Sequence, residues 1–478
     1  MTILITVLVY FAVLFGISHL TSRKADNNTF YRANRRAPWY MVAFGMIGAS
    51  ISGVTFVSVP GMVLSSQMTY LQMCLGFILG YAAIAFLLLP LYYRLNLTTI
   101  YSYLGQRLGE KSYLTGAGFF LLSKMTGAAV RFYVVCIILQ QFVFAPAGIP
   151  FAVNVVMMVL LIWLYTRRGG IGTLVFTDSF QTLCLFTALI MIILEVMGQL
   201  HLTIGEAVDA VAASPLSRIF VFDDWQSPLH FSKQFFSGMF IAIVMTGLDQ
   251  DMMQKNLTCK TLRDAQKDMC TYGVAFVPAN LLFLSLGILL TMVLGTDMNG
   301  DTLLPTYIAS SATADSPLFS FHASLTVLFT IGIVAASFSS ADSALTSLTT
   351  SYCVDIRRQP DNEQLRKRVH IAMCVFFTLF ILLFRTINST SLIDAIYILA
   401  SYTYGPLLGL FAFGLFTKRK AADSLVPAIC IASPLACYAL STAAIQLWDY
   451  HFGYELLMLN GLLTFTGLWL TTIKHISK

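Results

Sequence analysis

Hydroxyl and carboxylate side chains gather in residues 334–347, inside a long and otherwise apolar segment. Four serines follow an i, i+1, i+4, i+8 pattern and would share one helix face: Ser339, Ser340, Ser343 and Ser347. Asp342 lies at the border of that face. Such polar groups are costly in hydrocarbon unless they meet protein, water or a ligand, and their oxygens suit a hard cation. The pattern therefore indicates an ion site; the alternative is a small-residue seam for close helix packing.

Two basic residues, Lys124 and Arg131, lie in the middle of another apolar segment, residues 112–143. A charged side chain at membrane depth is a hypothesis of function. The guanidinium of Arg131 could grip a substrate carboxylate with two parallel hydrogen bonds. Alternatively, Arg131 pairs with an aspartate of the protein and serves packing.

The sequence gives little support for catalytic or metal-binding chemistry of His and Cys residues. The seven histidines lie mostly in loops or at the ends of apolar segments, with no HExxH motif, and the nine cysteines include no CxxC pair. The sequence therefore indicates no catalytic metal site and no disulfide framework. We expect that the protein is not an enzyme.

The composition indicates an all-α integral membrane protein, because 57% of the residues are hydrophobic and only 11% are charged, against about 25% charged in ordinary globular chains. A transmembrane helix needs to cross about 30 Å of hydrocarbon. Thirteen segments are candidates: 2–19, 40–66, 69–93, 112–143, 150–166, 174–197, 233–254, 270–295, 320–350, 369–387, 393–416, 425–446 and 455–473. The longest hydrophilic piece, 198–232, is too short for a separate soluble domain.

Most of the 29 Lys and Arg residues fall in one alternate set of the loops between these segments. The positive-inside rule places that set in the cytoplasm. We therefore expect a protein of the plasma (inner) membrane, with its N-terminus outside and its C-terminus in the cytoplasm. The basic composition needs no nucleic-acid partner, and no obligate protein partner is evident.

Two of the segments are interrupted. Residues 48–61 carry a Ser-Gly pair and then Pro60-Gly61, and residues 237–250 carry Gly247 before a charged end. Paired interruptions in corresponding positions point to a secondary transporter built from inverted repeats, and the carbonyls freed at a break need a partner such as a cation. A channel would predict a continuous polar pore instead.

Five motifs resemble the sodium:solute symporter family and occur in the family's order: the opening pair FYRANRRAPWY (30–40) and GASISGVTFVSVPG (48–61), then GGIGTLVFTDSFQT (169–182), TGLDQDMMQKNLTCKTLRDAQ (246–266), the serine stretch, and SYTYGPLLGLFAFGLFTKR (401–419). The resemblance implies a LeuT-like core of two inverted five-helix repeats. It divides the chain into an extra N-terminal helix with a cytoplasmic loop (1–39), the first repeat (40–197), the second repeat (233–416) and two C-terminal helices with a tail (425–478). It implies sodium-coupled symport of a small organic solute; the alternative is a proton-coupled transporter on the same fold.

The resemblance also implies a main sodium site, with sodium as the coupling ion. Its ligands would be the carbonyls of Gly48, Ile51 and Ala336 and the hydroxyls of Ser339 and Ser340. Gly48 replaces a common alanine, which we expect to be harmless because only the carbonyl is used.

Some family members bind a second sodium ion, and the matching positions here are Asp178, Asp342 and Ser343. The family often has a neutral residue where this chain has Asp342. That departure could strengthen a second sodium site or create a proton-coupled one; alternatively, Asp342 is neutralised by a nearby lysine or protonated.

The expected substrate-facing residues are Ser52, Thr55 and Phe56 beside the first interruption, with Gln72 as a further candidate and Arg131 as the carboxylate ligand. Some family members use an arginine on this helix for that purpose, and members carry sugars, proline, pantothenate, sialic acid and other small anions. Arg131 favours a carboxylate-bearing solute, and the other expected partner is the lipid bilayer.

Overall fold

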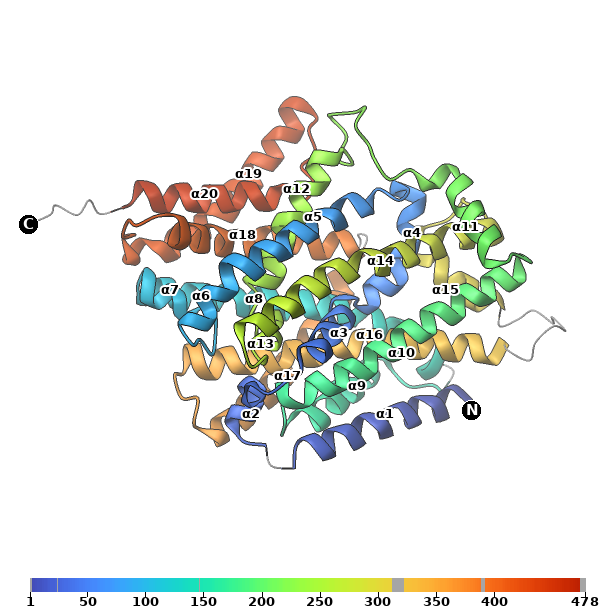
Figure 1. The fold of residues 1–478 in the computed structure, drawn as a ribbon, viewed down its shortest axis with the longest axis horizontal. Coiled ribbons are helices and arrows are strands. Elements are labelled where there is room, and N and C mark those ends of the chain that lie inside the picture. Colours follow the sequence, from blue (N-terminus) through green and yellow to red (C-terminus); the bar gives the residue numbers. More distant parts are fainter. Residues whose placement is uncertain (1, 24, 146, 312–321, 388–391, 473–478) are drawn as a thin grey trace, which may run out of the picture.

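The computed structural model describes residues 2–472 apart from residues 24, 146, 312–321 and 388–391. It is a bundle of helices (Figure 1), and among the described residues the only β-pairing is an isolated bridge between Ala37 and Cys259. The ends of two predicted segments, residues 320–321 and 473, and the tail to residue 478 lie outside the described residues.

The helices are α1 (Thr2–Thr21), α2 (Asn27–Arg32), α3 (Trp39–Ser50), α4 (Gly53–Ser66), α5 (Tyr70–Ala83), α6 (Leu89–Arg94), α7 (Ser102–Arg107), α8 (Glu110–Leu139), α9 (Phe151–Thr166), α10 (Ile171–Gln199), α11 (Ile204–Ala213), α12 (Phe231–Ala242), α13 (Gln250–Asn256), α14 (Leu262–Leu294), α15 (Gly300–Ser311), α16 (His322–Ser351), α17 (Glu363–Ile387), α18 (Leu392–Phe416), α19 (Val426–Trp448) and α20 (Leu456–Leu470). Four short π-helical segments continue longer helices: η2 (Ile84–Leu88), η3 (Gln140–Phe144), η5 (Ile243–Gly247) and η6 (Tyr352–Ile356). Three short 3-10 turns complete the set: η1 (Ala33–Arg35), η4 (Pro215–Ser217) and η7 (Asp423–Leu425).

The prediction of an all-α membrane protein is confirmed. In the described part of the chain, seven helices are long and apolar enough to cross a membrane, or nine if each bent pair counts as one span. Three shorter apolar helices, Ile5–Thr21, Phe151–Thr166 and Leu456–Leu470, accompany them. Each predicted segment corresponds to a helix or a bent pair, whereas the total of thirteen spans stays a prediction.

Both predicted interruptions are present. The axes of α3 and α4 differ by 63° across Ile51 and Ser52, and the Phe231–Gly247 segment meets α13 at 70° across Leu248 and Asp249. The first break allows a close approach to α16, because a Cβ on Gly53 would lie only 2.1 Å from the Ser337 oxygen. The bends therefore bring backbone, rather than side chains, against the neighbouring helices.

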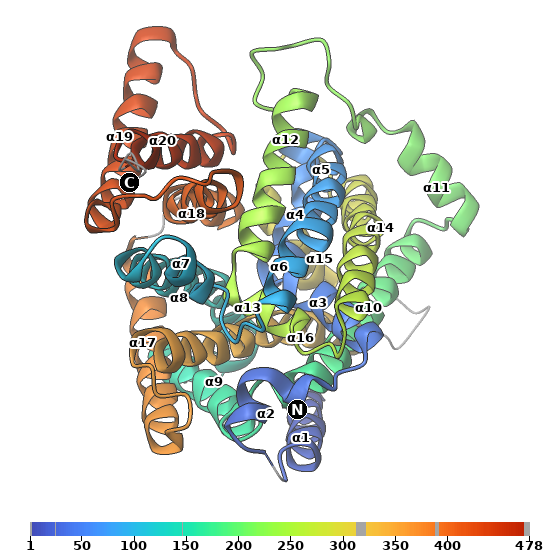
Figure 2. The same ribbon diagram turned by 60° about the vertical axis from the view of Figure 1, so that its left-hand side comes forward.

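Helix α16 lies at the centre of the molecule, in contact with α1, α3, α4, α8, α10 and α17. In the span Leu325–Ile356, 78% of the most apolar window is buried, against 22% in Asp423–Trp448. Figure 2 shows α18, α19 and α20 as a group to one side of the helices that surround α16. The serine stretch of α16 is therefore enclosed by protein, where its polar groups can find partners.

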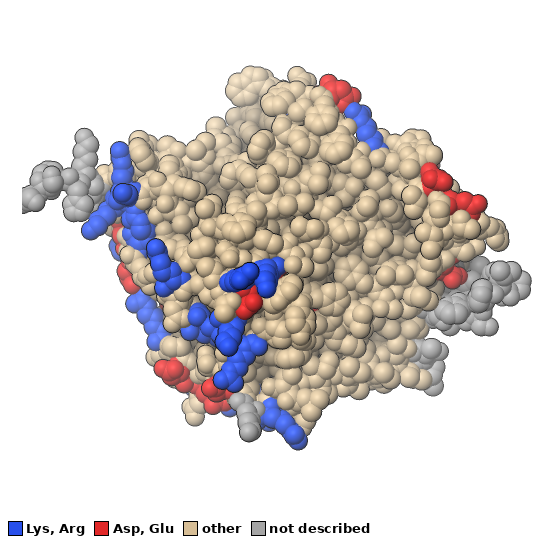
Figure 3. All heavy atoms as spheres, viewed as in Figure 1, with Lys and Arg blue, Asp and Glu red and all other residues tan. Residues whose placement is uncertain are grey.

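Charged residues are unevenly spread over the surface. On the face drawn in Figure 3, Lys and Arg side chains gather toward the end of the molecule where α2 and α7 lie, and a wide area free of charge adjoins them. A surface without charges is what contact with lipid requires, because a charged side chain is costly in hydrocarbon.

Candidate functional site

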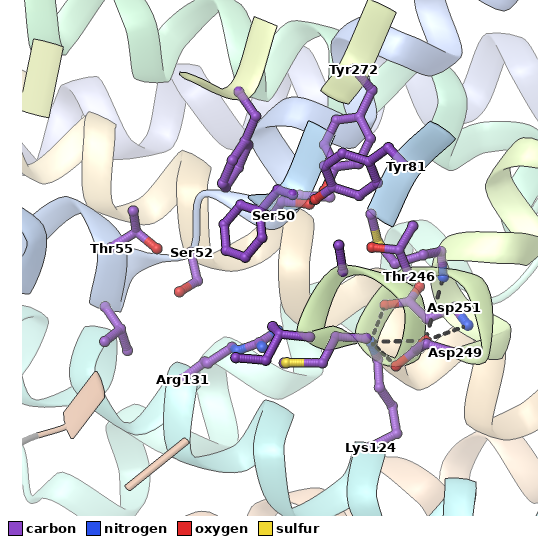
Figure 4. A pocket seen from close by; sticks show the side chains of 18 of the residues that line it. Ser50, Ser52, Thr55, Tyr81, Lys124, Arg131, Thr246, Asp249, Asp251 and Tyr272 are labelled. Carbon is purple, nitrogen blue, oxygen red and sulfur yellow. Dashed lines mark hydrogen bonds and ion pairs between the residues drawn. The ribbon is translucent and has the colours of Figure 1, made fainter. Parts of the chain in front are cut away.

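A cavity of about 100 Å³ lies beside both helix breaks, and residues of α3, α4, α5, α8, α12, η5, α13 and α14 line it, together with residues of the breaks themselves (Figure 4). Ser52 and Thr55 reach it from the first break, and Lys124 and Arg131 reach it from α8. The breaks expose the backbone and short polar side chains at membrane depth, which suits the binding of a polar solute.

Hydroxyl groups are linked along one wall of this cavity. Tyr272 of α14 lies between two partners: its hydroxyl is 2.6 Å from that of Ser50 and accepts a hydrogen bond from the Tyr81 hydroxyl at 2.9 Å. Figure 4 shows the two tyrosines on the opposite side of the cavity from Arg131. This wall ties α3, α5 and α14 together and offers aromatic rings and hydroxyls to a solute.

Arg131 is a cation that pairs with none of the described residues. Its side chain lines the cavity and makes no ion pair or hydrogen bond with any residue that the structure describes. This placement favours the first of the two alternatives raised by the sequence, a guanidinium available to a ligand, over a packing arginine paired with an aspartate.

The basic residue of α8 that pairs with aspartates is Lys124. Its ammonium lies 2.6 Å from Asp251 Oδ2 and 3.3 Å from both carboxylate oxygens of Asp249. Asp249 also caps α13 by accepting from the Asp251 N–H at 2.8 Å, and it accepts from the Tyr404 hydroxyl. This buried cluster fixes the second break to α8. The sequence indicated Lys124 but not its carboxylate partners.

Two predicted substrate residues do not line the cavity. Phe56 is fully buried and packs against Phe283 and Phe329, with ring centroids 5.5 Å and 6.2 Å away. Gln72 is also buried; its amide donates to the Leu229 carbonyl at 2.9 Å and accepts from the Val221 N–H at 3.1 Å. In this structure Phe56 therefore packs inside the bundle and Gln72 holds the segment before α12, and a role for either in substrate binding stays a prediction.

The first break leaves carbonyl groups free for a cation. The Ile51 N–H donates to the Ile47 carbonyl and the Ser52 N–H turns to Ser50, so the Gly48 carbonyl loses the partner that a continuous helix would provide. Gly48 itself packs against α10, where an added Cβ would lie 1.9 Å from the Thr182 hydroxyl oxygen. The glycine is therefore required by space, a reason that the sequence analysis did not find.

The predicted ligands on α16 are buried close to this break. Ala336, Ser339 and Ser340 are at most 6% exposed. The Ser339 hydroxyl donates to Asp178 Oδ1 at 3.0 Å. Since this bond uses the hydroxyl hydrogen, the remaining lone pairs of the oxygen are available to a cation.

One residue of the predicted second set of ligands, Asp178, pairs with a lysine that the sequence did not single out. Asp178 Oδ2 lies 2.7 Å from the ammonium of Lys255, which lies in the last turn of α13. Asp342 Oδ2 accepts a hydrogen bond from the Tyr165 hydroxyl at 2.6 Å. Asp342 and Ser343 are both buried, and the ion pair with Lys255 is made by Asp178 and not by Asp342. Asp178 and Lys255 lie in the motifs at residues 169–182 and 246–266, but nothing in the sequence indicates that these two residues pair.

The donor set suits a hard monovalent cation. Within the described residues, no three His, Cys, Asp or Glu side chains come together as metal ligands. The polar atoms near the first break are instead carbonyl and hydroxyl oxygens, which can replace part of a hydration shell without a large fixed charge.

Residues 30–425 match the family described as the sodium:solute symporter family. The chain is 25% identical to the sodium/sialic acid symporter SiaT of Proteus mirabilis, with 88% of this chain and 87% of that protein covered. It is also 25% identical to the sodium/sialic acid symporter NanT of Aliivibrio fischeri, with 88% and 84% covered.

Two solved structures share the fold. A Na+-coupled sialic acid symporter in a substrate-bound outward-open state gives a TM-score of 0.82 at 21% identity, covering 98% of this chain and 97% of that one. Mhp1, a nucleobase-cation-symport-1 family transporter in a closed conformation with bromovinylhydantoin bound, gives 0.57 at 16% identity, covering 92% of each chain. At these identities the likeness establishes the architecture.

Proposed function

The chain belongs to the sodium:solute symporter family, and we propose that it carries a small carboxylate-bearing organic solute across the membrane together with sodium, by alternating access. Family membership makes it a transporter and not an enzyme, with sodium as the coupling ion. It does not support the proton-coupled alternative. The observation that carries the substrate class is that Arg131, in a cavity between two broken helices, pairs with no residue in the described part of the chain.

In this cavity, Arg131 would bind the carboxylate of the solute through two parallel N–H groups. Ser52 and Thr55, which line the same cavity, would hydrogen-bond the rest of the solute. The tyrosine wall opposite Arg131 would cover an apolar or hydroxylated part of it. Sialic acid, which the relatives SiaT and NanT carry with sodium, has a carboxylate and several hydroxyls and is a suitable first probe.

The proposed main sodium site uses the Gly48, Ile51 and Ala336 carbonyls and the Ser339 and Ser340 hydroxyls. Its support is the carbonyl freed at the first break, the close approach of α16 to that break, and the burial of both serines. A sodium ion there would tie α3 to α16, so its binding and release would be coupled to movement of these helices.

We also propose how the chain is divided into repeats and membrane spans and how it is oriented in the membrane. We assign residues 40–197 and 233–416 to two inverted five-helix repeats, with residues 1–39 and 425–478 outside them and thirteen spans in all. The two bent pairs, one in each unit, support this division. The gathering of Lys and Arg at one end supports an orientation with the N-terminus outside and the C-terminus in the cytoplasm of the cell.

A binding screen tests the substrate class. Purified protein in sodium buffer is heated with single solutes, and the unfolding temperature is recorded for sialic acid, for other small carboxylates and for the matching uncharged amides. Ligands that bind the native state raise that temperature. We expect stabilisation by at least one carboxylate and none by its amide. Equal stabilisation by a carboxylate and its amide would remove Arg131 as the carboxylate ligand.

A further inference from the structure

Lys255 is a buried cation in the middle of the predicted ion-binding region. Its side chain is 3% exposed and reaches from the end of α13, after the second helix break, to Asp178 of α10. The ammonium lies 2.7 Å from Asp178 Oδ2. Asp342 lies on α16 one turn after Ser339, whose hydroxyl bonds to Asp178. We call Asp178, Asp342, Lys255, Ser339 and Tyr165 the polar cluster.

The oxygens of the polar cluster are largely engaged. Asp178 uses one oxygen on Ser339 and the other on Lys255, and Asp342 uses one oxygen on Tyr165. Among the predicted ligands of a second sodium ion, this leaves Asp342 Oδ1 and the Ser343 hydroxyl, both buried and without a hydrogen-bond partner in the described structure. Hard cations in proteins are usually surrounded by about six oxygens. Asp342 Oδ1 and the Ser343 hydroxyl fall short of that shell by themselves, and Asp178, the third predicted ligand, is held by the Lys255 ammonium.

The charge of the predicted ligand Asp178 is already compensated. The Lys255 ammonium lies 2.7 Å from Asp178 Oδ2. The other nearby ammonium, that of Lys124, is shared by Asp249 and Asp251. The carboxylate that a second sodium ion would need is therefore held by a positive charge that the chain itself supplies.

We propose that the Lys255 ammonium takes the place of a second sodium ion, so that each molecule binds one sodium ion, at the main site. This inference rests on the proposed function and revises the second sodium site predicted from Asp178, Asp342 and Ser343. Lys255 then acts as a positioning residue: it neutralises Asp178 while the Asp178 carboxylate orients the Ser339 hydroxyl toward the main site.

Counting bound sodium tests the inference without a transported solute. Equilibrium binding of radioactive sodium to purified protein gives the number of ions per molecule, after size-exclusion chromatography has confirmed that each variant is folded. Wild type should bind one ion. Lys255→Gln removes the ammonium and keeps polar atoms near Asp178, so it should bind two. Lys255→Arg keeps the charge and should bind one, and so should Asp178→Asn/Lys255→Gln, in which a carboxylate and an ammonium are removed together.

The outcomes separate this inference from the proposed function. Two sodium ions on the wild type would overturn the role of Lys255 and leave sodium-coupled transport intact, and this result needs no variant to fold. One ion on folded Lys255→Gln would show the Lys255–Asp178 pair to be structural only and would also overturn the inference. A wild type that binds no sodium would contradict the main site and the proposed function together with it.

Discussion

Ser339 is the residue at which the two sets of polar groups meet. Its hydroxyl hydrogen goes to Asp178, and its lone pairs remain for a cation at the break of α3 and α4. Sequence spacing was sufficient to single out Ser339 and its neighbours. The bond to Asp178 could not be predicted, because the two residues are 161 positions apart in the chain and meet only through the packing of α10 against α16.

We predict that Ser339→Ala and Ser340→Ala each raise the half-saturating sodium concentration by about tenfold, equivalent to about 1.4 kcal/mol. Each change removes one oxygen ligand with little change of volume, and such a loss is typical of one buried polar contact. The measurement is sodium-dependent stabilisation of the purified variants. Ser347→Ala is the matched control, because Ser347 lies on the same helix but bonds to the Ala344 carbonyl. An unchanged sodium affinity in both ligand variants would remove this assignment.

Arg131→Lys keeps the positive charge but loses the planar pair of N–H donors. We predict that the apparent affinity for the carboxylate solute falls about tenfold, while the maximal rate and the amount of folded protein change little. Uptake at varied solute concentration measures the change. If uptake and folded protein are lost in equal proportion, Arg131 serves structure instead. An uncharged solute, if one is carried, should be unaffected by the change.

At the scale of elements, the sequence predicted the two broken helices because each break carries its own local signal. Ser52-Gly53 and Gly247 lie where the helices bend by 63° and 70°. Which face of a helix lines the cavity, and which packs against another helix, was harder to predict. Phe56 follows Thr55 directly, yet one residue is in the packed interior and the other lines the cavity, since the period of a helix alone does not say which face meets a cavity and which meets another helix.

The contact between α3 and α10 depends on Gly48. We predict that Gly48→Ala destabilises the protein by about 1–3 kcal/mol, the usual cost of overpacking, because the new Cβ would lie 1.9 Å from the Thr182 hydroxyl and 2.8 Å from its Cβ. Thermal unfolding measures the loss, and Gly48→Ala/Thr182→Ala should recover part of it. Gly118→Ala on α8 is the control, since nothing lies within 4 Å of its added Cβ. Equal unfolding temperatures for Gly48→Ala and wild type would show that α3 and α10 can separate freely.

At the scale of the whole molecule, hydropathy and the distribution of charge predicted a membrane bundle, and the structure agrees. What they could not predict is how the charges within the bundle are balanced. Lys124 and Asp249 are 125 residues apart, and Lys255 meets Asp178 across two different helices. Buried ion pairs of this kind are formed by the tertiary packing and leave no periodic pattern in the sequence.

The proposed orientation, with the C-terminus in the cytoplasm, predicts the outcome of fusing reporter proteins to the C-terminus. A green fluorescent protein fused there should be fluorescent, because it folds in the cytoplasm, and a fused alkaline phosphatase should be inactive, because it needs the outside compartment. Both reporters are compared at equal expression. An active phosphatase fusion would reverse the orientation and would place the basic loops outside.

Energy coupling follows from the number of ions. A tenfold sodium gradient supplies about 1.4 kcal/mol per ion, and a membrane potential of 100 mV adds about 2.3 kcal/mol for each net charge moved. One sodium ion carried with a monovalent anion moves no net charge, so about tenfold accumulation of the solute is the limit. Transport of such an anion should therefore be nearly independent of the membrane potential.

Sodium-driven uptake tests the central claim most directly. Proteoliposomes are given the carboxylate that best stabilises the protein, with an inward sodium gradient, with potassium in place of sodium, or with a proton gradient in the absence of sodium. We predict that the solute accumulates above its external concentration only with the sodium gradient, and that accumulation ends when the gradient is abolished. Accumulation driven by the proton gradient without sodium would contradict sodium-coupled symport by this protein.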